Sequence, residues 1–157
     1  MVFTGINMGC NLGSDTLYSG TVGAAAEASM SGYHAVAVSV NSREATHFDA
    51  ACHYALELID RIYGKLSTDT VINLNTPDAP LSEVKGIKTL ALGGRYYEDR
   101  YYLQEDGTYE LSGHPFDHGE REETDMDALN DGYATITPLQ FDFTDDSKMD
   151  ILKGWKF

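Results

Sequence analysis

Apolar residues recur with two different spacings along the first ninety positions, and this alternation predicts a succession of strands and helices. Residues 21–31 are rich in alanine, with apolar side chains at helical spacing. Residues 35–40 form a short apolar run, which is typical of a strand buried on both faces. Residues 46–63 carry one apolar stripe and end before Gly64, which predicts a longer second helix.

Two more apolar runs, at residues 70–74 and 87–92, predict strands on either side of a loop at residues 76–80. Val2 and Phe3 indicate the end of another buried strand. The order strand, helix, strand, helix, strand is typical of an α/β domain, in which a parallel sheet carries helices on its faces.

The pattern changes after this core. Paired tyrosines around an Asp106-Gly107 step predict a β-hairpin between residues 96 and 111. We predict one domain over residues 1–157: a core over 1–94, the hairpin and an acidic surface excursion over 95–131, and a last strand and C-terminal helix over 132–157.

Composition narrows the class of protein. The 157 residues suffice for one domain whose core needs no disulfide or structural metal. The formal net charge of −14 argues against nucleic acid and anionic membranes as partners, because both attract clustered Lys and Arg. Cys10 and Cys52 lack the spacing of a zinc site. No run approaches the roughly 20 apolar residues of a membrane span, and no signal peptide is recognisable. We expect a cytoplasmic protein.

The segment over residues 4–15 carries the candidate chemistry. Its glycines stand four residues apart, with Asn7 and Asn11 between them. Glycine at this density disfavours a helix, so a loop is predicted. Glycine also lets the backbone approach a ligand closely, and asparagine offers an amide oxygen to a metal or an amide N–H to a phosphate oxygen.

The Gly/Asn-rich segment leads through Ser19, Gly20 and Thr21 into the alanine-rich helix. Unpaired backbone N–H groups at a helix N-terminus, beside hydroxyl side chains, form an anion site. Two interpretations stay open on these residues alone: a phosphate cradle, or a glycine-rich turn followed by an ordinary Ser/Thr N-cap. The segment is neither a Walker loop nor a GxGxxG dinucleotide motif.

Residues 4–13, TGINMGCNLG, and residues 18–22, YSGTV, resemble the SGINxGxNxG…YSGTV signature of the SurE family, with Thr4 in place of serine. Further blocks in the same order resemble the family's LNINVP, KGIRVT and TD…GYVSITPL segments, namely residues 71–77, 85–88, and 124–125 with 132–139. The resemblance implies a three-layer α/β/α, Rossmann-like sheet with a protruding β-hairpin and a C-terminal helix, incomplete at its N-terminal side.

The family resemblance also implies an activity. SurE proteins are divalent-metal-dependent phosphatases that act mainly on nucleoside 5′-monophosphates. Transferred to this sequence, Asn7 is a metal ligand for Mg or Mn, and Asn11 is a second catalytic residue that contacts the phosphate. Ser19, Gly20 and Thr21 hold the phosphate oxygens. The resemblance further implies a homodimer or tetramer, assembled through residues 96–111 and 145–157.

One part of the family pattern is missing. No Asn-Asp-Asp-Gly block occurs in the sequence, so the paired aspartates that ligate the metal are absent. A lone amide oxygen is a poor ligand for hard cations, which prefer carboxylates. We therefore expect little hydrolysis by this chain alone, and either a truncated gene product or one half of a split enzyme with a separate N-terminal segment. A non-catalytic nucleotide- or anion-binding module, and a purely structural fragment, are the alternatives.

Other acidic, histidine and tyrosine groups have simpler interpretations. Asp145 and Asp146 fit the acidic N-terminus of a helix better than a substitute metal pair. His114 and His118 flank Asp117 and could form a metal or acid site, but Pro115 favours a loop there. The acidic run over residues 120–127 is predicted to be a solvated face. The tyrosines over 96–109 fit core or oligomer packing better than base stacking.

Overall fold

The computed structural model describes residues 1–157 except 95, 98, 114, 117–121 and 157. The elements of the sheet and its covering helices are β1 (Val2–Met8), α1 (Gly20–Met30), β2 (Ala35–Val40), α2 (Asp49–Ile62), β3 (Val71–Thr76), β4 (Ile87–Thr89) and β9 (Ala134–Leu139). The remaining elements are η1 (Gly13–Tyr18), η2 (Leu81–Glu83), β5 (Tyr96–Tyr97), β6 (Arg100–Leu103), β7 (Tyr109–Ser112), β8 (Pro115–Phe116), α3 (Asp125–Asn130) and α4 (Asp146–Lys153).

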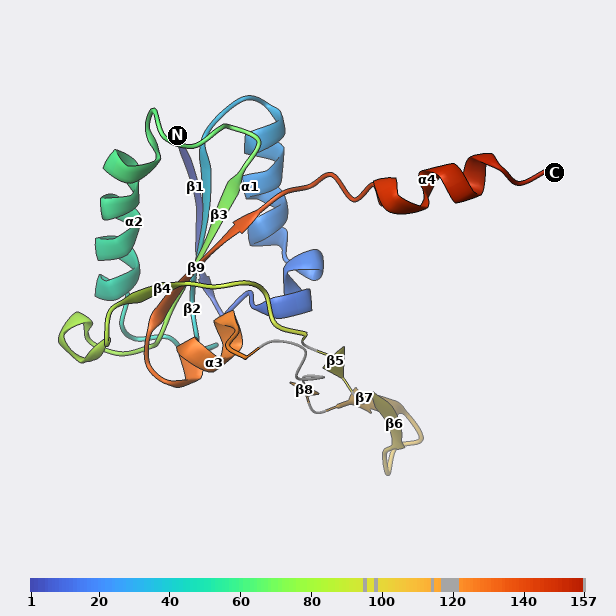
Figure 1. The fold of residues 1–157 in the computed structure, drawn as a ribbon. Coiled ribbons are helices and arrows are strands. Elements are labelled where there is room, and N and C mark those ends of the chain that lie inside the picture. The colour runs from blue at the N-terminus through green and yellow to red at the C-terminus, as the bar shows by residue number, and fades with distance from the viewer. Residues whose placement is uncertain (95, 98, 114, 117–121, 157) are drawn as a thin grey trace.

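Five strands form one sheet in the order β1-β2-β3-β9-β4. Strands β1, β2 and β3 are parallel, as the sequence predicts, whereas β9 runs antiparallel to β3. Strand β9 is in turn parallel to β4, so the sheet is mixed: the parallel arrangement predicted for the first part of the chain holds for β1, β2 and β3, and the direction reverses at β9 and β4. Helices α1 and α2 lie on opposite faces of the sheet, which confirms the three-layer α/β/α arrangement (Figure 1).

The core lies at the two faces of β2 and β3, whose residues are buried throughout. Continuous apolar runs are typical of central strands covered on both sides. On one face, the apolar stripe of α2 packs through Tyr54, Leu58 and Ile62 on alternate residues of the sheet. On the other face, α1 packs through Val22 and Ala25 on Val71 and its neighbours. The alanines of α1 let this helix approach the sheet closely.

Two predicted boundaries are corrected. Residues 4–8 were expected in a loop, but they belong to β1, which pairs with β2 and shifts register between Thr4 and Asn7. The sequence of β1 shows no continuous apolar run, because β1 is an edge strand whose residues alternate between partly buried and exposed. The strand predicted at residues 87–92 ends at Thr89, and Leu90 makes one more backbone bond to Ile136 of β9.

The hairpin β6–β7 and helix α4 extend away from the sheet and its two covering helices (Figure 1). Every residue of both hairpin strands is exposed, and α4 has no buried residue. Asp145 caps α4 through Ser147 N, and Asp146 lies in its first turn, which confirms the helix-terminus interpretation. No helix among the described residues is long and apolar enough to cross a membrane.

Candidate phosphate-binding site

Asn7 lies at the C-terminal end of β1, where ligand sites of parallel sheets form. A cavity of about 350 Å³ opens there between the ends of β1 and β2. It is lined by Asn7, Met8, Gly9, Cys10, Asp15, Asn41, Ser42 and Arg43. The Asn7 Nδ2 atom donates to the Gly9 carbonyl at 2.7 Å, which leaves Oδ1 as the atom that could meet a cation.

Gly5 lets β1 pass close to β2 just before Asn7. Its φ is +116°, and a Cβ atom at this position would lie 2.3 Å from the Val38 carbonyl oxygen. Real Cβ atoms do not approach a backbone oxygen so closely, so any other residue must push β1 away. The position of Asn7 at the strand end therefore depends on Gly5.

The structure confirms the predicted N-cap at the start of α1, and two backbone N–H groups there have no acceptor among the described residues. Ser19 is the N-cap, and its Oγ accepts from Val22 N at 3.1 Å. The backbone N–H groups of Gly20 and Thr21 meet no acceptor in the described part of the chain. Gly20 is exposed, and a Cβ atom added to it would meet no other atom within 4 Å. The Thr4 hydroxyl donates to the Thr21 carbonyl at 2.8 Å, which ties this helix end to β1. An anion at Gly20 and Thr21 is compatible with the cap.

Asn11, predicted to contact phosphate, is 7% exposed and anchors the loop to the sheet. Its backbone N–H donates to Asn75 Oδ1 at 2.8 Å, and its carbonyl accepts from Asn73 Nδ2 at 2.8 Å and Asn75 Nδ2 at 3.1 Å. Its own Nδ2 donates to Ser39 Oγ at 2.7 Å. One side-chain N–H of Asn11 is thus used inside the protein.

These partners form a buried polar floor under the loop. Cross-strand register places Ser39, Asn75 and Thr135 in one row, and Asn73 and Thr137 in the next. All five are buried. The same face of the sheet is apolar further toward the strand beginnings, where α1 covers it. Sequence reasoning missed this floor, although two asparagines at alternate positions of an otherwise apolar strand are its signal.

Asp125 is a second feature that the sequence did not reveal. The acidic run was predicted to be a solvated face, but Asp125 is fully buried. Its Oδ2 accepts from Gly13 N at 2.9 Å, and its Oδ1 accepts from Gly93 N at 2.8 Å. Burial raises the pKa of this carboxyl, and the two backbone N–H groups oppose the rise. Elsewhere in the run, Glu122, Glu123 and Asp127 are exposed, as predicted.

The residues around Asn7 do not by themselves fit a Mg²⁺ or Mn²⁺ site. Among the described residues, Asp15 is the one carboxylate that lines the cavity, and Arg43 adds a positive charge. The described residues contain no group of three His, Cys, Asp or Glu side chains that could hold a metal. Hard divalent cations prefer several carboxylate oxygens. The site suggested by His114, His118 and Asp117 lies outside the described residues.

Comparison with known proteins agrees with this arrangement. The family described as Survival protein SurE matches residues 1–99. The chain belongs to the SurE family. The solved structure titled "Crystal Structure of Sure Protein from Aquifex aeolicus" is 34% identical, with a TM-score of 0.82 over 97% of this chain. That likeness confirms the SurE-like α/β fold.

This chain covers 63% of the length of the Aquifex aeolicus SurE chain. The matched family segment includes Asn7, Asn11, Ser19, Gly20 and Thr21. Membership in the SurE family favours phosphatase or nucleotidase chemistry, while the roles of these five residues stay predictions.

Proposed function

We propose that this chain forms the phosphate-binding part of a SurE-type phosphoric monoester hydrolase that acts on nucleoside 5′-monophosphates. The observation that carries the proposal is the N-terminus of α1, where the backbone N–H groups of Gly20 and Thr21 have no acceptor among the described residues and Gly20 is exposed, within the segment that matches the SurE family. A helix N-terminus stabilises a phosphate through these donors and through its dipole.

In this proposal each residue of the site has a separate task. Gly20 and Thr21 donate to phosphate oxygens, and the Ser19 hydroxyl can add a donor while its oxygen caps the helix. Asn7 would supply an amide oxygen to a divalent metal whose carboxylate ligands come from outside the described residues. Asn11 fixes the loop between them through the asparagines of β3. A bound Mg²⁺ or Mn²⁺ would polarise the phosphoryl group and activate water.

The missing carboxylates are proposed to come from a separate SurE-type N-terminal segment. The side of β1 opposite β2 pairs with no strand among the described residues. A largely apolar cavity of about 240 Å³ lies along β1, lined by Phe3, Thr4, Gly5, Ile6, Val38, Cys52, Ala55 and Leu56. A bare strand edge beside an apolar cavity is suited to an added strand.

Phosphate release from 5′-AMP tests the proposal. With Mn²⁺, the chain alone is expected to release phosphate at the background rate, because its residues do not complete the metal site. Addition of a SurE N-terminal segment that carries Asn-Asp-Asp-Gly should raise the rate at least about tenfold. The same segment with both aspartates changed to asparagine is the matched control.

A segment that binds the chain without restoring phosphate release contradicts the catalytic proposal. Retained binding of 5′-AMP by the chain would then favour the alternative, a non-catalytic nucleotide- or anion-binding SurE-like module. This alternative is favoured by the same helix N-terminus, combined with a cavity at Asn7 whose described lining includes a single carboxylate, that of Asp15.

We also propose that a second copy of the chain covers the hairpin and α4. Tyr101 and Leu103 of β6 are 72% and 65% exposed, and Ile151 and Trp155 near the C-terminus are 58% and 57% exposed. Changing Ile151 and Trp155 to serine should raise the dissociation constant of the oligomer at least about tenfold, measured by analytical ultracentrifugation. Lys148→Ser on the same helix is the control, and equal effects would contradict this interface.

A further inference from the structure

Asp125 joins three parts of the chain that are distant in sequence. Its Oδ2 accepts from Gly13 N, at the start of η1, and its Oδ1 accepts from Gly93 N, in the segment that leads to the hairpin. Its own backbone N–H donates to the Ala91 carbonyl at 3.0 Å. Gly13, Gly93 and Asp125 are all buried, so these bonds are shielded from water.

Helix capping does not explain the Asp125 carboxylate. The N-terminus of α3 is capped by Thr124 and Asp127, which form a complete capping box. The side chain of Asp125 instead leaves its own helix and bonds to two other segments. A buried carboxylate is unfavourable unless its oxygens accept hydrogen bonds, and here each oxygen has a backbone donor.

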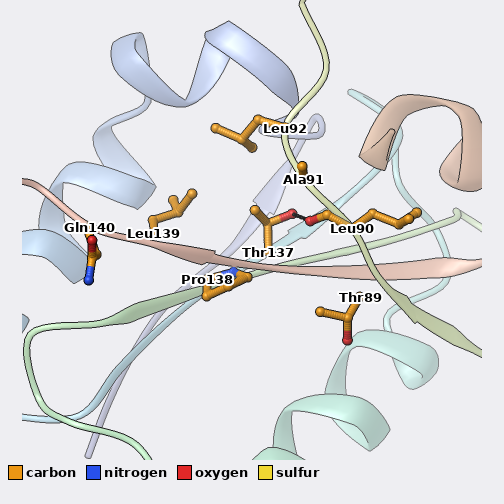
Figure 2. Close-up of a pocket in the computed structure, with 8 residues that line it drawn as sticks. All are labelled: Thr89, Leu90, Ala91, Leu92, Thr137, Pro138, Leu139 and Gln140. Atoms are coloured by element: carbon orange, nitrogen blue, oxygen red, sulfur yellow. Dashed lines mark hydrogen bonds between the residues drawn. The ribbon is translucent and has the colours of Figure 1, made fainter. Parts of the chain in front are cut away.

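Hydrogen bonds hold the segment over residues 90–93 near both of its ends. The Thr137 hydroxyl of β9 donates to the Leu90 carbonyl at 2.8 Å, as Figure 2 shows. The next two contacts are the Asp125 bonds to Ala91 and Gly93. A cavity of about 570 Å³ lies between this segment and β9. Leu92 packs against the core cluster beside α1, and the Leu90 N–H donates to the Ile136 carbonyl at 3.1 Å. The bonds to Thr137 and Asp125 act together with these contacts to set the position of the segment.

We infer that Asp125 is a positioning residue that fixes the loop over residues 9–13, between β1 and η1, and the segment over residues 90–93 in one arrangement. The inference rests on the proposed function, because it assigns the purpose of the Gly13 bond to anion binding at Gly20 and Thr21. Gly13 opens the single 3-10 helix that separates the loop from Ser19. A shift at Gly13 therefore moves the start of α1 relative to Asn7.

Two oxygens are needed for this task, which predicts a specific effect of Asp125→Asn. The amide offers one acceptor and turns an N–H₂ group toward the second backbone donor, so one of the two bonds must break. In this variant, amide exchange at Gly13 or Gly93 should become at least about tenfold faster, as followed by ¹⁵N–¹H spectra. The dissociation constant for inorganic phosphate should rise about tenfold.

Asp127→Asn is the matched control, since Asp127 lies on the same helix but its carboxylate bonds only to Thr124 among the described residues. Loss of its cap is expected to leave exchange at Gly13 and the phosphate affinity unchanged. Equal effects of the two substitutions, or unchanged exchange at both glycines in Asp125→Asn, overturn the inference.

If Asp125→Asn does not fold, ¹⁵N–¹H spectra of the unaltered chain test the inference instead. Titration with inorganic phosphate should shift the amide signals of Gly13 and Gly93 with the same midpoint as those of Gly20 and Thr21. A stationary Gly93 signal during that titration overturns the inference. A chain that binds no phosphate contradicts the proposed function, and amide exchange in the variants then decides on Asp125.

Discussion

Replacing Gly5 with alanine is expected to lower the free energy of unfolding by about 3 kcal/mol or more. Gly5 has φ +116°, and its added Cβ would lie 2.3 Å from the Val38 carbonyl oxygen. The clash is with backbone in the central part of the sheet, so no flexible side chain can move aside. Strand β1 must separate from β2 or unpair locally, and both responses remove ladder hydrogen bonds.

Gly23→Ala is the control for this experiment. Gly23 lies within α1 and is exposed, and a Cβ atom added to it would have no neighbouring atom within 4 Å. Alanine there should stabilise the protein by about 0.5–1 kcal/mol, because it favours the helix. Urea unfolding followed by far-UV circular dichroism measures both changes. A loss below about 1 kcal/mol for Gly5→Ala would mean that β1 does not approach Val38 in this way.

The central elements were predictable because the spacing of their apolar residues along the sequence reflects which side chains are buried. Helix α2 follows one apolar stripe, and its apolar side chains face the sheet as the stripe requires. Strand β2 was predicted to its last residue because all six side chains are buried. The full length of strand β1 was not predicted, because an edge strand needs no continuous apolar run. This strand also contains Gly5, where its backbone passes close to the Val38 carbonyl.

The support of the candidate site could not be predicted from local pattern. Asn11 and Asn75 are 64 positions apart, and Gly13 and Asp125 are 112 apart. Their partnership depends on sheet order and on the antiparallel entry of β9, which no spacing in the sequence specifies. The family signature pointed to the loop and the start of α1. It did not indicate that buried amides and one carboxylate hold them in place.

Asn75 is the residue of the polar floor whose loss should matter most. It is 1% exposed, and its amide both accepts from Asn11 N and donates to Asn11 O, as a neighbouring strand would. Asn75→Leu keeps the branching of the side chain at Cγ, adds some volume, and leaves the buried Asn11 N–H without an acceptor. Because Asn73 also donates to the Asn11 carbonyl, that oxygen keeps one partner. The free energy of unfolding should fall on the order of 3 kcal/mol.

The same substitution should release the loop before it unfolds the sheet. Amide exchange at Asn11 is expected to become at least about tenfold faster, while exchange in β2 follows global unfolding. Thr76→Val is the matched control on the same strand, since the buried Thr76 hydroxyl has no partner among the described residues. Removing a hydroxyl without partners should be neutral or stabilising, within about 1 kcal/mol. If both variants lose the same stability, burial in β3 alone explains Asn75, and its bonds to Asn11 contribute nothing specific to the loop.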